Sequence, residues 1–145
     1  GYIKNLGPEF LGSLALGQFN KIIKSAKRPI KLLLLDQQKL AGAGNIYANE
    51  ALWCAKIHPK ITADKLSKEQ ITKLFNCLEN ILKQAIKWKG ASRNDYRDAF
   101  GQKGEVQDHF QVYDRVGEPC KRCQTLIKKI ILGGRGTYIC PACQR

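Results

Sequence analysis

Apolar residues recur at helical spacing through the first two thirds of the chain and predict four helices. The second helix is apolar throughout, which favours burial, and a polar, glycine-rich turn separates it from the third. The fourth helix has the strongest pattern, because Ser67 and Gln70 have the spacing of a capping box and Gly90 is a natural terminator. The predicted helices cover residues 10–23, 30–35, 46–54 and 67–90.

The helical period is lost in the last third of the chain. Residues 90–111 hold three glycines and mixed charge, which is typical of a long exposed loop. Residues 110–113 alternate in the manner of a strand and lead into a cysteine-containing module. The sequence therefore divides into a lead-in at 1–9, a helical domain at 10–90, a loop at 91–111 and a small β-rich module at 112–145.

Four of the six cysteines form two tight pairs separated by 16 residues. The pairs are Cys120 with Cys123 and Cys140 with Cys143. This spacing is typical of four thiolates that hold one structural Zn²⁺ ion. The alternative is a pair of disulfides in a secreted protein, which the absence of an apolar leader disfavours. The other two cysteines, Cys54 and Cys77, lie in helical apolar patterns and are expected to be core thiols.

The charge balance narrows the class of partner. Twenty-five Lys and Arg stand against 12 Asp and Glu, so the formal charge is +13, while an apolar content of 43 % is enough for a real core. No apolar run approaches the roughly 20 residues of a membrane span, and we expect a soluble, intracellular protein. A charge this positive favours a polyanion, with nucleic acid the first candidate and an anionic membrane surface the second.

Two glycine-rich turns offer places to bind such a partner. Backbone amides at Gly42, Gly44 and Asn45 open a helix, a geometry that binds phosphate, although a plain tight turn between helices is the simpler interpretation. Arg135, with glycines on both sides in the cysteine-containing module, can extend towards a phosphate or a base edge, or can simply be a solvated charge. Trp53 is expected to pack rather than to stack on bases. These residues alone indicate a two-part nucleic-acid binder and no catalyst.

Two blocks of sequence carry a specific resemblance. Residues 35–52, followed by Ile-His-Pro at 57–59, closely resemble the helix-two-turn-helix signature of the formamidopyrimidine-DNA glycosylases. Residues 112–120, Gly134-Arg135 and the closing segment 140–144 are similar to the C-terminal zinc finger of that family, although Gln124 stands where a glycine commonly follows the second cysteine. The resemblance implies a mainly α fold, with a helix-two-turn-helix domain followed by a small β-hairpin zinc finger.

The resemblance also implies a function. Members of the family excise oxidised purines such as 8-oxoguanine and formamidopyrimidines in base excision repair, and then cleave the strand as AP lyases. It implies double-stranded DNA with a damaged base or abasic site as partner, a monomer, and a bacterial cytoplasmic, nucleoid-associated location. It places Asn45, Gly44 and Arg135 at DNA phosphates, with Lys27 and Lys31 as weaker candidates. The segment from Ser92 through Tyr96 to Gly104 matches the loop that closes over the flipped base.

Catalysis in the family uses an N-terminal proline amine as Schiff-base nucleophile. This chain opens with Gly1-Tyr2, and the nitrogen of Pro8 is part of a peptide bond and is therefore not nucleophilic. We therefore expect the C-terminal half of such an enzyme without its catalytic domain, inactive alone, with no catalytic residue except for a late-elimination role of Arg135. Two alternatives stay open: a stand-alone, non-enzymatic zinc-ribbon nucleic-acid-binding module, and residual lyase activity through a lysine amine.

Overall fold

The computed structural model describes residues 16–38, 44–92 and 110–145. We refer to the first two ranges as the helical region and to residues 110–145 as the finger. The elements are α2 (Leu16–Lys24), α3 (Ile30–Gln38), α4 (Gly44–Cys54), the 3-10 helix η2 (Ala63–Lys65), α5 (Lys68–Ser92), β1 (Lys128–Leu132) and β2 (Arg135–Ile139). Within the described ranges, four α-helices are followed by a two-stranded antiparallel hairpin, which confirms the predicted mainly α fold class.

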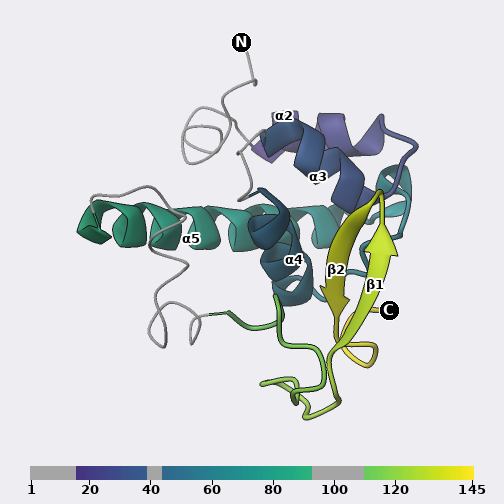
Figure 1. Ribbon diagram of the computed structural model, residues 1–145. Coiled ribbons are helices and arrows are strands. Elements are labelled where there is room, and N and C mark those ends of the chain that lie inside the picture. The colour runs from purple at the N-terminus through teal and green to yellow at the C-terminus, as the bar shows by residue number, and fades with distance from the viewer. Residues whose placement is uncertain (1–15, 39–43, 93–109) are drawn as a thin grey trace.

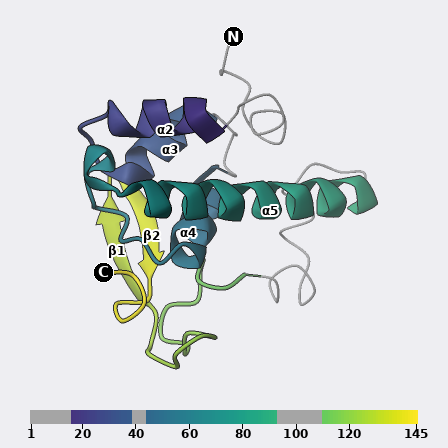
Figure 2. The same cartoon turned by 180° about the vertical axis from the view of Figure 1, so that it is seen from behind.

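The longest helix organises the helical region. Helix α5 crosses the molecule, with α2 and α3 along one side of it and α4 packed across it (Figure 1). The view from behind shows α5 in front and the β hairpin at the far side, next to α4 (Figure 2). Among the described residues, no helix is sufficiently long and apolar to cross a bilayer.

The predicted helices are confirmed where the structure describes them, with shifted ends. Helix α3 continues to Gln38, three residues beyond its apolar run, and α4 begins at Gly44. The capping box opens α5 as expected: the backbone amide of Gln70 donates to the Ser67 hydroxyl at 3.1 Å, and the Ser67 amide donates to the Gln70 side chain at 2.8 Å. The first residues of the helix predicted at 10–23 lie outside the described residues.

Helix α4 is buried on almost every side, as expected for a helix with apolar residues all round. It contacts α3, α5 and β2, and it contributes to two separate apolar clusters. Ala51 and Leu52 belong to the core of the helical region, whereas Trp53 belongs to a second core in the finger. The finger core is formed by Trp53, Val112, Cys120, Ile127, Tyr138 and Cys140.

The strand predicted at 110–113 is wrong. The backbone amides of Gln111, Val112 and Tyr113 all donate to the carboxylate of Glu50 in α4, at 2.8, 2.9 and 2.8 Å. A carboxylate that binds three successive amides holds the chain in a turn, and these amides are then not available to a strand partner. Burial raises the pKa of Glu50, although the three backbone hydrogen bonds act in the opposite direction.

The two cysteines of the helical region are also paired differently from the expectation. Cys77 is buried, as expected for a core position, but its sulfur is bonded to that of Cys54, so neither is a free thiol. This disulfide joins the last residue of α4 to the middle of α5. The helical pattern revealed that both residues are inward-facing but contained no information on their mutual distance.

Candidate nucleic-acid interface and metal centre

The four cysteines of the finger converge on one point. Their sulfur atoms all lie within 4.8 Å of one another, with Cys120 to Cys143 at 3.8 Å and Cys123 to Cys140 at 3.5 Å. Thiolates at about 2.3 Å from a tetrahedral zinc ion lie about 3.8 Å apart, so the cluster fits one Zn²⁺. This confirms the predicted metal ligands as a group that can hold the ion.

The protein prepares one of these sulfurs for metal binding. Hydrogen bonds with the side chain and backbone of Thr125 lower the pKa of Cys123 to about 6, whereas burial raises the pKa of Cys140 to about 12. Zinc binds thiolates, so Cys140 would have to lose its proton to act as a ligand. Because zinc is bound by deprotonated sulfur, metal uptake is expected to become tighter as pH rises.

One residue of the first cysteine turn has an unusual backbone conformation. Gln124 follows the second cysteine with φ at 71°, in the left-handed region, and its amide donates to the Cys120 carbonyl at 2.8 Å. Glycine adopts this conformation without strain, which explains why a glycine commonly stands at this position of the resembling family. The departure noted from the sequence is therefore a local feature of the turn.

The tip of the β hairpin is a two-residue turn. Gly133 and Gly134 have φ values of 61° and 77°, and Leu132 pairs with Arg135 across the turn. Two consecutive positive φ angles are typical of the type I′ turn that suits the twist of a hairpin. A Cβ built on Gly133 would lie 2.5 Å from Leu32 Cδ2, so the turn packs closely against α3. Both glycines therefore serve the turn, and Gly133 also permits the close contact with α3.

Arg135 is exposed at the start of β2. Its guanidinium makes no hydrogen bond or ion pair with any residue that the structure describes. Directly after it, the carbonyl of Gly136 accepts a hydrogen bond from the Asn45 side chain at 3.2 Å. Asn45 is the second residue of α4, so the hairpin tip is attached to the N-terminal end of that helix. The N-terminal end of α4 and the hairpin tip, both singled out from the sequence, are thus neighbours in space. Gly42 lies outside the described residues.

Lys31 of α3 also binds the hairpin next to the Asn45–Gly136 contact. It is fully buried, and its ammonium donates to the Thr137 hydroxyl at 2.7 Å and lies 3.5 Å from the Gly136 carbonyl. Burial, and secondarily the charge of Arg135, lowers the pKa of Lys31 to about 8. The sequence suggested Lys31 as a phosphate contact, but its side chain faces the hairpin instead of solvent. Its charge still adds to the positive potential around Arg135.

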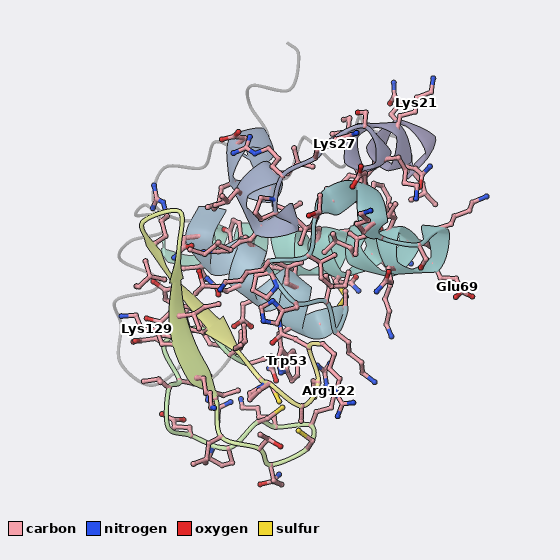
Figure 3. The ribbon with its side chains drawn as sticks, turned by 90° about the vertical axis from the view of Figure 1, so that its right-hand side faces the viewer. Lys21, Lys27, Trp53, Glu69, Arg122 and Lys129 are labelled. Carbon is pink, nitrogen blue, oxygen red and sulfur yellow. A yellow bond between two sulfur atoms is a disulfide. The ribbon has the colours of Figure 1, made fainter. Side chains whose placement is uncertain are left out.

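The other residues predicted to bind DNA or to form the loop over the flipped base do not gather at one place among the described residues. Lys27 is exposed in the turn after α2, and Figure 3 shows it on the same side of the molecule as Lys21. Gly44 is buried as the first residue of α4. Ser92 is the last residue of α5 instead of a loop residue. Tyr96 and Gly104 lie outside the described residues.

Besides Asn45, two polar residues of α4 hold the finger, and sequence reasoning did not identify them. Asn49 accepts the backbone amide of Tyr138 at 2.7 Å and Glu50 binds the turn at 111–113. From the finger, Gln144 donates to the Ile57 carbonyl at 3.1 Å while it accepts the amide of Cys140 at 2.8 Å. The available signal was Asn49-Glu50 in an otherwise apolar helix, because buried polar groups need partners.

The comparison with known proteins agrees with this geometry. The family described as "Formamidopyrimidine-DNA glycosylase H2TH domain" matches residues 6–96, and "Zinc finger found in FPG and IleRS" matches residues 117–145. The matches define a protein that combines an H2TH domain with a zinc finger of this type. The chain belongs to the formamidopyrimidine-DNA glycosylase family.

Curated relatives and solved structures extend over nearly the whole chain. The formamidopyrimidine-DNA glycosylase of Chloroflexus aurantiacus is 51 % identical over 122 residues, which cover 84 % of this chain and 44 % of the relative. That of Streptococcus pneumoniae is 45 % identical over 143 residues, 98 % of this chain and 52 % of the relative. The chain thus spans about half the length of the curated relatives it matches.

Two solved structures have the same fold. The crystal structure of MutM (Fpg) from Thermus thermophilus matches with a TM-score of 0.80 and 38 % identity, covering 97 % of this chain and 54 % of that one. The complex of Lactococcus lactis Fpg with DNA that contains an abasic site matches with a TM-score of 0.81 and 37 % identity, covering 98 % and 51 %.

Proposed function

We propose that this chain is the DNA-binding part of a bifunctional DNA glycosylase and AP lyase that excises oxidised purines in base excision repair. One observation carries the proposal: Arg135, whose exposed guanidinium is unpaired among the described residues, lies next to Gly136, and the Asn45 contact to the Gly136 carbonyl holds this part of the hairpin at the N-terminal end of α4. A free guanidinium and a helix N-terminus are both anion-binding groups. Together they form a compact site for the phosphates on either side of an extruded nucleotide.

Electrostatics support a polyanionic ligand at this site. The chain carries a formal charge of +13, and Lys31 lies immediately beneath the hairpin, where its charge would help to attract phosphate. Exposed Lys27 would add a further, weaker contact to the DNA backbone. The structures of relatives with damaged or abasic-site DNA support duplex DNA as the polyanion.

The test compares two duplexes of the same sequence, one intact and one with a tetrahydrofuran abasic analogue. We expect tighter binding of the 145-residue chain to the abasic duplex in fluorescence anisotropy. Arg135→Ala should weaken this binding roughly 10- to 100-fold, because a charged hydrogen bond contributes about 1.5–3 kcal/mol. The slope of log affinity against log salt should fall by roughly 0.9 for each lost phosphate contact.

Arg145→Ala is the matched control, because Arg145 is an exposed arginine of the same finger whose side chain bonds only to the carbonyl of Ala142 among the described residues. It should change the affinity far less than Arg135→Ala. Equal affinity of the wild-type chain for the two duplexes would instead favour a stand-alone, non-enzymatic nucleic-acid-binding module.

The chemical step has its own test. We propose that the 145-residue chain alone forms no Schiff base with an abasic site, and that Arg135 acts on phosphates during late elimination. A reacting amine would add to the sugar aldehyde and lose water, and borohydride would reduce the resulting imine to a stable amine. Trapping on abasic DNA should therefore give no covalent adduct, and an adduct would assign lyase activity to a lysine of this chain.

A further inference from the structure

The cysteine cluster is bonded to helix α4 through an indole. Trp53 lies one residue before the end of α4, with only 8 % of its surface exposed, and its ring N–H donates to the sulfur of Cys120 at 3.4 Å. A donor to a thiolate sulfur stabilises the negative charge that metal binding requires. Trp53 is thus part of α4 in the helical region and also a hydrogen-bond donor to the cysteine cluster of the finger.

Arg122 stacks over the face of the same indole. Its guanidinium carbon lies 3.7 Å from the centre of the Trp53 ring, and Figure 3 shows the two side chains together next to the sulfur atoms. Arg122 also donates to the Trp53 carbonyl at 2.6 Å and to the Cys54 carbonyl at 3.4 Å. These carbonyls lie at the C-terminal end of α4, where the helix dipole is negative, and the Trp53 carbonyl also accepts the backbone amide of Lys56 at 3.1 Å.

The same guanidinium reaches the metal site. Its Nε donates to the sulfur of Cys143 at 3.3 Å, and the backbone amide of Arg122 donates to Cys120 at 3.4 Å. A planar guanidinium can stack on a ring and donate in its own plane at the same time, which an ammonium cannot do. Arg122 therefore contacts one sulfur of each cysteine pair and the end of α4.

The opposite end of α4 holds the hairpin tip. Eleven residues at 1.5 Å each make α4 about 16 Å long, with Asn45 at one end and Trp53 at the other. The finger therefore contacts the helix at both ends, through the cysteine cluster at one and through Gly136 at the other. A change in the cluster can alter the placement of Arg135 on α4, because strand β2 runs directly from Arg135 to Ile139 and is followed by Cys140 of the cluster.

We propose that Arg122 and Trp53 are positioning residues that couple zinc occupancy of the cysteine cluster to the placement of the β hairpin on α4, and thereby to DNA affinity. The DNA part of this inference rests on the function proposed above. Neither residue touches the predicted phosphate site, so both act through the placement of Arg135 and Asn45.

The variants separate the parts of this contact. Arg122→Gln removes the charge and the stacked fork, Arg122→Lys keeps the charge alone, and Trp53→Phe keeps the ring but removes its N–H. Lys128→Gln is the matched control, since Lys128 is exposed on β1 and makes no hydrogen bond or ion pair with the described residues. Any effect of lost positive charge as such appears in both glutamine variants.

The first measurement is zinc affinity by competition with a chromophoric chelator. Removal of a group that supports a metal ligand typically weakens binding about 10- to 100-fold. We expect about 10-fold weaker zinc binding in Arg122→Gln and Trp53→Phe, with Lys128→Gln within about twofold of the wild type. Unchanged zinc affinity in Arg122→Gln would overturn the proposal, whatever the folding of the tryptophan variant.

The second measurement uses Trp53 as its own reporter. The chain has two tryptophans, so Trp88→Phe leaves Trp53 as the single emitter. We expect removal of zinc to shift its emission to longer wavelength, because the ring loses its sulfur and guanidinium neighbours and meets water. Emission that is the same with and without zinc would contradict the coupling.

The third measurement is affinity for the abasic duplex at saturating zinc. Arg122→Lys, which keeps the charge, should bind several-fold more weakly than the wild type, and Arg122→Gln should lose more than Lys128→Gln. Equal losses in the two glutamine variants would overturn the link to DNA. If the wild-type chain fails to prefer the abasic duplex, the proposed function is wrong. The zinc affinities and the fluorescence would still test whether Arg122 and Trp53 support the cysteine cluster.

Discussion

The helical region and the finger are stabilised in different ways. The helical region buries a large apolar core, to which Phe19 belongs and against which Phe75 packs with the two ring centres 5.2 Å apart. The Cys54–Cys77 disulfide joins α4 to α5 in the same region. The apolar cluster of the finger contains only six buried residues, of which two belong to the cysteine cluster and one, Trp53, comes from α4. The finger leaves Val116, Leu126 and Ile131 more than half exposed. A region with so little burial depends on metal and on polar contacts to its neighbour for its fold.

Removal of the metal is expected to have the largest effect, because it should destabilise the finger far more than the helical region. Chelation of zinc, or Cys140→Ser, should unfold the finger and leave most of the helical signal, because structural zinc supplies folding free energy directly. Far-UV circular dichroism and amide hydrogen exchange measure the two regions separately. Loss of helix together with the metal would show that they fold as one unit.

The next largest effect is expected at the turn held by α4. Glu50→Ala leaves three backbone amides without their acceptor, and each unsatisfied buried donor costs about 1–3 kcal/mol, so we expect a loss of at least ~3 kcal/mol in urea unfolding. Glu50→Gln retains one acceptor oxygen and should lose less. A small effect of Glu50→Ala would mean that the finger holds this turn without α4.

Stability should also depend on pH through Lys31. Its pKa in the folded protein is about 8, below the ordinary value of 10.5. Between these values the unfolded chain binds more protons, so the free energy of unfolding should rise with pH from about 8 to 10.5, by about 1–3 kcal/mol. Lys31→Met should remove this rise, as urea titrations at about pH 7.5 and about pH 10 would reveal. The same pH dependence in both proteins would contradict the buried, deprotonating lysine.

The hairpin turn gives a smaller, paired test. Gly133→Ala and Gly134→Ala both place a side chain at positive φ, but only the first brings a Cβ close to Leu32. We expect losses of about 1–2 kcal/mol for each, with Gly133→Ala the larger, and weaker DNA binding for Gly133→Ala alone because the tip moves away from α3. Equal effects of the two variants in thermal unfolding and in anisotropy would show that the contact with α3 does not determine the position of the hairpin tip.

The smallest expected effect is an increase in the stability of the finger. Gln124→Gly removes the strain of a left-handed residue and should stabilise the finger by about 1 kcal/mol, with zinc affinity raised accordingly. The helical region should not respond. A loss of stability would mean that the Gln124 side chain makes a contact that outweighs the backbone strain.

The sequence predicted features encoded by nearby residues and missed those that depend on distant ones. The capping box of Ser67 and Gln70 and the four-cysteine cluster follow from short spacings, and the structure confirms both. The turn at 111–113 depends on Glu50, far earlier in the chain, so alternation alone predicted a strand. The contact between Asn45 and Gly136 likewise needs the folded arrangement of two regions.

The central claim is that Asn45 and Arg135 bind the same DNA. Asn45 lies on α4 and Arg135 on the hairpin, next to the Asn45–Gly136 hydrogen bond that joins the two. A double-mutant cycle of Asn45→Ala and Arg135→Ala on affinity for the abasic duplex tests this claim most directly. We predict that each single variant weakens binding and that the double variant loses clearly less than the sum, with a coupling of about 0.5–3 kcal/mol. Losses that add fully, or single variants that bind as the wild type does, would contradict the account.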